Sequence, residues 1–270
     1  MNLLKRLSRK DGPIMKRKKS LLAFLMIASL CQPATTWAAE VDLLDKYPVK
    51  TPLFTQGLEL DPTGKELILG TGLEGKSQLG KFNLQSGELE DAKNLPNNYF
   101  GEGITFTPNA LWQLTWKEKK VLKRDPKTFE ILDEIDINTE GWGICYDPDE
   151  KVIWRSDGTS TLYKHDPETF ELLGQVKIMN GKLAASKLNE LEWANGHIYA
   201  NRLYRDEILK IDLASESVVE TYDVRPMLDQ TLNEEEIASV DTLNGIAHIE
   251  GDEFYITGKL YPYIYKVRLK

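Results

Sequence analysis

The 270-residue sequence is poor in the side chains on which metal and redox sites depend, with two cysteines and three histidines. The histidines, at positions 165, 197 and 248, are widely separated and show no paired spacing on a helix or hairpin, which argues against a histidine-based zinc site. Cys31 falls in a segment that we expect to be removed, so Cys145 would remain alone and no intrachain disulfide could form. We interpret Cys145 as a small buried apolar residue of a strand. The sequence therefore indicates neither a metal nor a cofactor.

Long hydrophobic runs are also missing. The most apolar segment, at 21–30, is too short for a bilayer, which needs about 20 apolar residues. It follows a basic cluster at 16–19 and precedes small residues near Ala38, the pattern of a secretory signal peptide. We therefore predict a signal peptide over 1–39, with Met15 as a possible true start, and an exported protein, periplasmic or secreted. Cys31 leaves a lipid anchor open, although Leu30 stands where lipoprotein signals need a small residue.

Positive charge is scarce in the part that would remain. Eight of the 34 basic side chains and one of the 42 acidic side chains lie in the first 38 residues. The remaining residues therefore carry 26 basic and 41 acidic side chains, a net charge of −15. A chain this acidic should not bind a polyanion through its overall field, so nucleic acid is not an expected partner. The segment 40–270 has the size of one domain with a substantial core, and we expect it to be a monomer.

A short phrase recurs five times in this segment. Its copies read GKFNLQSGEL (80–89), VLKRDPKTFEIL (121–132), LYKHDPETFELL (162–173), ILKIDLASESVV (208–219) and IYKVRLK (264–270). In each complete copy an alternating strand leads through a polar turn into a second strand. The aligned lysines are separated by 42, 41, 46 and 56 residues. A period of roughly 40–50 residues with several short strands is typical of propeller blades.

The sequence thus predicts an all-β, five-bladed β-propeller over 40–270. The terminal strand IYKVRL would join N-terminal residues in one blade, which closes the ring and leaves no open edge. One helical stretch is expected, at 225–239, and it accounts for the long last step of the repeat. In a propeller, loops from every blade converge at one end of the axis, so a binding site is expected there.

A second set of phrases lies between the copies and does not look repetitive. In chain order these phrases are FTQGLEL, GTGLEGKS, YFGEGITF, WQLTWKE, EGWGICYD, SDGTSTLYKHDPETF, LNELEWANGHIYAN and LNGIAHIEGDEFYITGKLYP. Their order and spacing, from about residue 50 to the end, resemble the metal-independent glutaminyl-peptide cyclotransferases of plants and bacteria, which are five-bladed propellers. The resemblance implies conversion of the N-terminal glutamine of peptides and proteins to pyroglutamate with release of ammonia.

The resemblance also implies roles for individual residues. Gln56 and Asn189 would pair with the substrate carboxamide, and Lys259 would stabilise the oxyanion or the leaving group. Trp116 and Trp142 would form aromatic walls, while Phe54 lies two positions from Gln56 and should face the same way. Glu190 of LNELE would join the substrate-binding set. Each residue also has an ordinary structural interpretation, since a tryptophan in an all-β protein is usually core and Lys259 could be a solvated loop end.

The sequence departs from the family at several positions, and at two central positions of the expected pocket the residue is aliphatic. The resemblance implies a general acid/base glutamate in an E-S-T-G-L phrase, and Leu69 stands at that place. Glu66 would point to the opposite face of the strand, so Glu74 is the carboxylate that could compensate. The carboxylates at 102, 140, 190 and 192 match family positions to which the resemblance gives structural roles. Leu203 replaces a tryptophan that usually follows the asparagine of ANRLYRD.

Three functional hypotheses follow. The first is an active glutaminyl-peptide cyclotransferase that uses Asn189, Lys259, Gln56 and Glu74. The second is a catalytically impaired propeller that keeps a pocket for a peptide end or small ligand, which Leu69 and Leu203 would favour. The third is a calcium-dependent propeller hydrolase, for which only Glu190 and Glu192 are candidate ligands. The ordered motifs favour the first.

Overall fold

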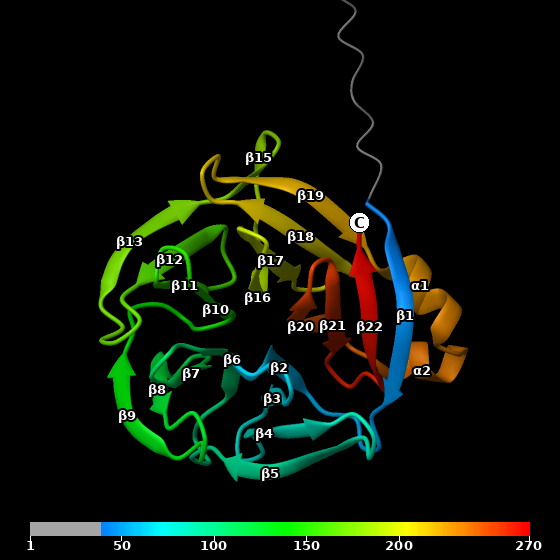
Figure 1. Cartoon of the computed structure of the whole chain (residues 1–270), viewed down its shortest axis with the longest axis horizontal. Coiled ribbons are helices and arrows are strands. Elements are labelled where there is room, and N and C mark those ends of the chain that lie inside the picture. The colour runs from blue at the N-terminus through cyan, green and yellow to red at the C-terminus, as the bar shows by residue number, and fades with distance from the viewer. Residues whose placement is uncertain (1–38) are drawn as a thin grey trace, which may run out of the picture. The chain divides into compact units, whose positions relative to one another are not determined.

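A computed structural model describes residues 39–270, so the predicted signal peptide lies outside the described residues apart from its last position. Five small antiparallel sheets are arranged in a ring around a central axis (Figure 1), which confirms the predicted five-bladed propeller. Within residues 39–270, no helix has the length and apolarity needed to cross a bilayer.

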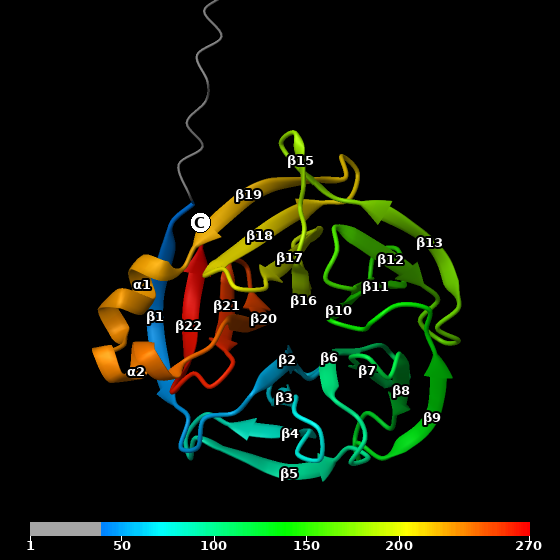
Figure 2. The same ribbon diagram turned by 180° about the vertical axis from the view of Figure 1, so that it is seen from behind.

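The blades follow one another in chain order, and each has its first strand nearest the axis (Figures 1 and 2). The first three blades are β2 (Thr55–Leu60), β3 (Leu67–Thr71), β4 (Gln78–Asn83) and β5 (Glu88–Asn94); β6 (Gly101–Phe106), β7 (Leu111–Thr115), β8 (Lys120–Arg124) and β9 (Ile131–Asp136); and β10 (Ile144–Asp147), β11 (Val152–Ser156), β12 (Thr161–His165) and β13 (Leu172–Lys177). The last two are β16 (Leu188–Ala194), β17 (His197–Arg202), β18 (Glu207–Asp212) and β19 (Ser217–Asp223); and β20 (Leu243–Glu250), β21 (Glu253–Gly258), β22 (Tyr263–Leu269) and β1 (Val41–Pro48).

The ring closes through the two ends of the described chain. Strand β22 pairs antiparallel with β1, so the last blade takes its outermost strand from the N-terminal side, as the sequence predicted. The five repeated phrases form the outer hairpins β4–β5, β8–β9, β12–β13 and β18–β19 and the strand β22. A further small hairpin, β14 (Met179–Asn180) and β15 (Leu183–Ala184), extends the fourth sheet at the rim.

The predicted helical insertion is present as two short helices beside the last blade, α1 (Arg225–Thr231) and α2 (Glu234–Ser239). Asn233 caps α2 in a capping box with Glu236, since each side chain bonds the other residue's backbone N–H. Met227 and Leu228 of α1 are buried in the cluster that joins the fourth and fifth blades. The helices thus cover one edge of the ring and leave its axis free.

The core lies between blades. Five apolar clusters each join two neighbouring sheets, and the cluster between the first and last blades contains Leu58, Leu69, Phe82 and Ile264. Cys145 is buried in the cluster between the third and fourth blades, as predicted, and burial raises the pKa of its thiol well above the usual range. Because each sheet is covered on both faces by its neighbours, the blades hold the inner strands at fixed distances around the axis.

Candidate active site

The inner strands carry a repeat of their own, which sequence comparison within the chain had missed. Four of the five blades have the same short pattern at the start of the inner strand: a polar or aromatic side chain, then glycine, then leucine or isoleucine. The fourth blade has the pattern with glutamate in place of glycine. The polar or aromatic residues are Gln56, Glu102, Trp142, Asn189 and Asn244, one from each blade. They form a ring of five side chains around one end of the axis.

A bulge produces four of the five members of this ring; the fifth, Trp142, precedes β10, whose pairing with β11 has no register shift. In β2 the pairing with β3 shifts between Thr55 and Gly57, so that Gln56 is an extra residue opposite a single partner. The same irregularity occurs at the corresponding places of β6, β16 and β20. A bulge interrupts the in–out alternation of a strand and re-aims one side chain. Here it turns Gln56 and its counterparts away from the interblade core and toward the axis.

Glycine follows the bulge because the next blade's backbone is too close for a side chain. A Cβ on Gly57 would lie 2.8 Å from the backbone nitrogen of Ile104, and one on Gly143 would lie 1.9 Å from the carbonyl oxygen of Asn189. In the fourth blade Glu190 takes the glycine's place. Its carboxylate accepts the backbone N–H of Leu58 at 3.4 Å and of Ile246 at 3.0 Å. Glu190 therefore connects three blades beneath the ring.

A second ring is formed by residues that directly follow the second strand of a blade, among them Gly72, Trp116, Leu203 and Lys259. Its backbone is fixed by repeated hydrogen bonds, in which Gly72 donates to Phe54, Trp116 to Phe100, Leu203 to Lys187 and Lys259 to Thr242. The two rings enclose a cavity of about 220 Å³. Its lining residues are Phe54, Gln56, Phe100, Glu102, Trp116, Trp142, Asn189, Leu203, Tyr204, Asp241 and Lys259.

The pocket thus brings together six of the eight residues that the sequence put forward. Phe54, Gln56, Trp116, Trp142, Asn189 and Lys259 all line it. The structure does not bring Glu74 or Glu190 to this cavity. Glu74 is an exposed loop residue, and Glu190 is completely buried under the ring with both oxygens bonded to backbone N–H groups. The roles of the six remain proposals, which their convergence supports.

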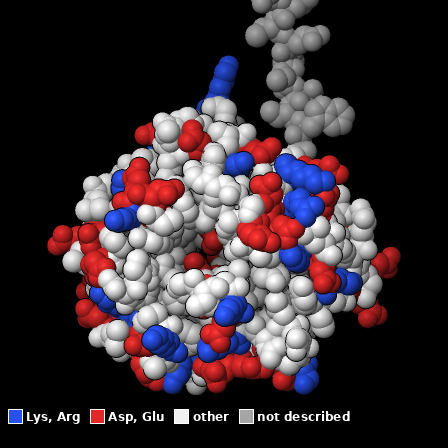
Figure 3. Space-filling model, in the orientation of Figure 1, with Lys and Arg blue, Asp and Glu red and all other residues white. Residues whose placement is uncertain are grey.

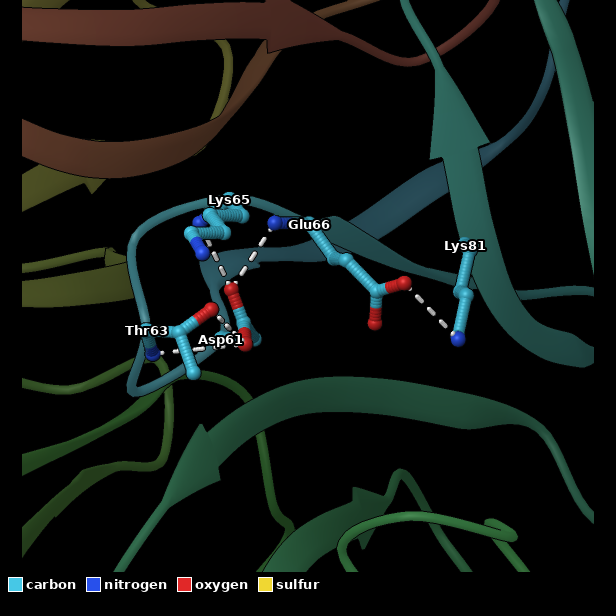
Figure 4. A network of polar contacts seen from close by, with 5 residues as sticks. All are labelled: Asp61, Thr63, Lys65, Glu66 and Lys81. Carbon is cyan, nitrogen blue, oxygen red and sulfur yellow. Dashed lines mark hydrogen bonds and ion pairs between the residues drawn. The ribbon is translucent and has the colours of Figure 1, made fainter.

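Leu69 is also absent from the pocket. Its side chain is 1% exposed and packs among the apolar residues between the first and last blades. Glu66, three residues earlier, is exposed and forms an ion pair with Lys81 at 2.9 Å (Figure 4). The same loop is fixed by Asp61, which accepts hydrogen bonds from Thr63 and from the backbone at 65 and 66. The first blade therefore supplies no carboxylate to the cavity.

The second blade supplies a carboxylate to the cavity instead. Glu102 is 5% exposed and accepts a hydrogen bond from Nε2 of Gln56 at 3.0 Å. Gln56 in turn accepts from Asn244 at 2.9 Å, so three members of the first ring form a chain of hydrogen bonds. Burial raises the pKa of Glu102 well above its usual range; the positive charge of Lys259 opposes this, and Glu140 and Glu118 add to it. Burial therefore favours the protonated form of Glu102.

The sequence contained a signal for Glu102 that went unused. GEG at 101–103 is the second-blade copy of QG at 56–57 and WG at 142–143, so the inner-strand repeat aligns Glu102 with Gln56. The structural role that the resemblance gave to this carboxylate rested on comparison of single motifs. Alignment of the five inner strands would have placed it on the axis.

Two buried polar side chains of the pocket have no hydrogen-bond partner among the described residues. Lys259 is 7% exposed and its Nζ makes no hydrogen bond or ion pair there; the ring of Phe54 lies 5.0 Å away. Burial lowers the pKa of Lys259, and the charges of Glu102 and Asp241 partly offset this. The carboxamide of Asn189, 2% exposed, likewise makes no side-chain hydrogen bond within residues 39–270. Both side chains line the cavity and are therefore available to bond a ligand there.

Further carboxylates lie on the inner strands, outside the pocket. Glu59, Glu190 and Glu192 lie on the inner strands β2 and β16, and Figure 3 shows acidic side chains in the hollow at the centre of the molecule. Burial raises the pKa of Glu59 to about 8 and keeps those of Glu190 and Glu192 well above their usual range. No group of three or more His, Cys, Asp or Glu side chains between residues 39 and 270 is arranged for a metal.

Comparison with known proteins identifies the family. The sequence profile of the glutamine cyclotransferases matches residues 19–269. A glutaminyl-peptide cyclotransferase of Arabidopsis thaliana is 32% identical over 233 residues, which are 86% of this chain and 72% of that protein. The chain belongs to the glutamine cyclotransferase family.

Solved structures agree with this assignment. The crystal structure of Myxococcus xanthus glutaminyl cyclase superposes with a TM-score of 0.74 at 32% identity, over 85% of this chain and 96% of that one. An aldose sugar dehydrogenase of Streptomyces coelicolor, solved with bound PQQ, matches with a TM-score of 0.55 at 12% identity, over 87% of this chain and 100% of that one. The second likeness concerns the fold alone. The Myxococcus xanthus enzyme is similar to this chain in both sequence and structure.

Proposed function

We propose that this member of the glutamine cyclotransferase family is an active glutaminyl-peptide cyclotransferase, which closes the N-terminal glutamine of a peptide to pyroglutamate. The observation that carries the proposal is the convergence of a buried carboxyl, Glu102, with two unpartnered polar side chains, Asn189 and Lys259, in one aromatic pocket. The cavity, at about 220 Å³, is below the roughly 300–1,000 Å³ of sites for drug-sized ligands. It therefore suits a single residue at a chain end.

The reaction needs the α-amine to attack the γ-carboxamide carbon, so that a C–N bond forms within the residue and the amide C–N bond breaks to release ammonia. The amine must be neutral, and its ordinary pKa is about 7.7–8.0. The side chain must also fold back on itself. Rigid aromatic walls, here Phe100, Trp116 and Trp142, favour this by holding the reacting atoms close and away from water.

Each polar group has a part in this scheme. Lys259 donates to the carboxamide oxygen, where negative charge develops in the tetrahedral intermediate. Asn189 pairs with the substrate's nitrogen atoms through its carbonyl oxygen. Glu102 gives its proton to the departing nitrogen and receives the proton that the attacking amine loses, so the acid is regenerated and no water is consumed. Gln56 holds the carboxyl of Glu102 in one orientation.

The replacement of the family's glutamate by Leu69 does not weaken this scheme. Leu69 belongs to the core between two blades, whereas Glu102 lines the pocket. An impaired, purely ligand-binding propeller would be expected if the cavity lacked a proton-transfer group. With Glu102 present, no feature of the described site favours that alternative.

Ammonia release from a peptide with N-terminal glutamine, with pyroglutamate detected by mass, tests the proposal. We expect turnover by the wild type and a loss of at least about 100-fold in Asn189→Ala and in Lys259→Ala. Glu74→Ala is the matched control, because Glu74 is exposed and outside the cavity. A folded wild-type protein without turnover would support the ligand-binding alternative. Equal losses in Glu74→Ala and Lys259→Ala would contradict the assignment of the site.

The proposal includes export and a monomeric state. Export is supported by the basic and apolar segments at 16–19 and 21–30 and by the single cysteine of the described chain. Amino-terminal sequencing of protein secreted by a host cell should find a start near residue 39 or 40. A start at residue 1 or 15 would contradict cleavage, and sedimentation equilibrium would test the monomer.

A further inference from the structure

The two indole walls of the pocket are held by one atom. Nε1 of Trp116 donates to Oε2 of Glu140 at 2.9 Å, and Nε1 of Trp142 donates to the same oxygen at 3.0 Å. The two tryptophans belong to different blades, since Trp116 follows β7 and Trp142 precedes β10. Glu140 lies on the connection between these blades. One carboxylate oxygen therefore fixes the separation of the two rings.

The connection that carries Glu140 is itself anchored. Nη1 of Arg155 donates to the backbone oxygen of Glu140 at 2.8 Å and to Oγ1 of Thr139 at 2.9 Å. The Arg155 side chain is 2% exposed and also stacks on Tyr163, with 4.5 Å between the guanidinium carbon and the ring centroid. The carboxylate of Glu140 makes no ion pair among the described residues. Its charge is stabilised by the two indole N–H groups instead.

We propose that Glu140 is a positioning residue, which sets the spacing of Trp116 and Trp142 through one shared oxygen and places a negative charge near Glu102. The inference rests on the proposed cyclotransferase function, for which the two rings confine the folded side chain. Hydrogen bonds to a charged acceptor are about twice as strong as neutral ones. Two of them on one oxygen leave neither ring free to rotate about its side-chain bonds.

The charge of Glu140 has a separate effect from its hydrogen bonds. The charged groups that act on Glu102 are Lys259, Glu140 and Glu118, and the last two favour the protonated form. Removal of one negative charge should lower the pKa of Glu102. Glu102 acts in its protonated form, so activity that is lost as pH rises through this pKa should then be lost at lower pH. A purely structural role for Glu140 would not move this limb of the pH profile.

Two substitutions separate the effects. Glu140→Gln keeps an oxygen that can accept both indole N–H groups and removes the charge. We expect a loss of kcat/KM of only a few-fold, with the alkaline limb of the kcat/KM profile shifted to lower pH. Glu140→Ala removes the oxygen as well, and we expect kcat/KM to fall about 10–100-fold because small misplacements of positioning groups have effects of this size. Glu118→Gln is the charge-matched control. The Glu118 carboxylate accepts the backbone N–H of Phe100 at 3.2 Å and neither indole N–H, and glutamine keeps an accepting oxygen, so the limb should shift while the indoles stay in place.

A readout independent of turnover completes the test. In a ¹H–¹⁵N spectrum, the indole resonances of Trp116 and Trp142, assigned with Trp116→Phe and Trp142→Phe, should both move in Glu140→Ala and stay near their places in Glu140→Gln. Trp112 and Trp154 serve as internal references. Unmoved Trp116 and Trp142 resonances in a folded Glu140→Ala protein, or wild-type kcat/KM in that variant, would overturn the inference. Moved resonances in a protein that never turns over glutaminyl peptides would support the positioning role and contradict the proposed function.

Discussion

Nε2 of Gln56 lies 3.0 Å from Oε1 of Glu102, although the two residues are 46 positions apart and belong to neighbouring blades. The contact exists because both residues occupy the same bulged position at the start of an inner strand. It orients the Glu102 carboxyl in the pocket, where burial raises the pKa of that carboxyl well above its usual range. The carboxyl that we propose for proton transfer thus comes from the second blade, and the first blade supplies the amide that orients it.

Leu69→Glu, which would restore the family's glutamate, is expected to harm the protein without improving its activity. The side chain at 69 is enclosed between the first and last blades by Leu58, Phe82 and Ile264. An unpaired charge there should lower the free energy of unfolding by roughly 3–5 kcal/mol. Urea unfolding and ammonia release would be measured together, with Leu69→Met as the volume-matched control. A gain of turnover in Leu69→Glu would contradict the present placement of the acid.

The propeller fold could be predicted from the sequence more fully than the pocket could. The outer hairpins repeat visibly because each consists of two strands of alternating polar and apolar residues joined by a polar turn. The five blades and the closure by β22 were therefore predictable. The inner strands repeat in only three positions, and Glu190 replaces glycine in one of them. The residues of the pocket could be named from family motifs, but Glu102 could not be preferred over Glu74. That choice needs the alignment of the five inner strands, which a pattern of only three positions makes hard to recognise before the bulges are seen in the structure.

Leu203→Trp is expected to strengthen substrate binding. Leu203 lines the pocket at the position of the second ring where the family usually has tryptophan. An added aromatic face opposite the existing walls contributes about 0.5–1.5 kcal/mol, so KM for a peptide with N-terminal glutamine should fall about 2–10-fold. Steady-state kinetics would measure this, with Leu203→Met as a control that adds no ring. An increase in KM would show that the cavity has no room for the indole.

Asp61 should contribute stability that depends on pH. Burial opposes its ionisation, but hydrogen bonds from the backbone at 66, 65 and 63 and from the hydroxyl of Thr63 outweigh burial and lower its pKa. A carboxylate with a lowered pKa in the folded state stabilises the protein above its unfolded pKa of about 3.9 and loses this effect as pH falls through the folded value.

Asp61→Asn should therefore lower the free energy of unfolding by about 1–2 kcal/mol at neutral pH, with a difference that shrinks in acid. Urea titrations of both proteins across this range would measure it. Lys81→Ala is a suitable comparison, since it breaks only the neighbouring exposed ion pair with Glu66 and should have a smaller effect. A difference between wild type and Asp61→Asn that stays constant down to about pH 2 would contradict the lowered pKa.

The most direct measurement of the central claim is kcat for ammonia release from a peptide with N-terminal glutamine, compared between wild type and Glu102→Gln. The substitution keeps the size of the side chain and its contact with Gln56 but removes the transferable proton. If Glu102 is the acid of the pocket, kcat should fall about 10²–10⁴-fold, while the variant unfolds at a similar urea concentration. A folded Glu102→Gln protein with wild-type kcat would contradict the account.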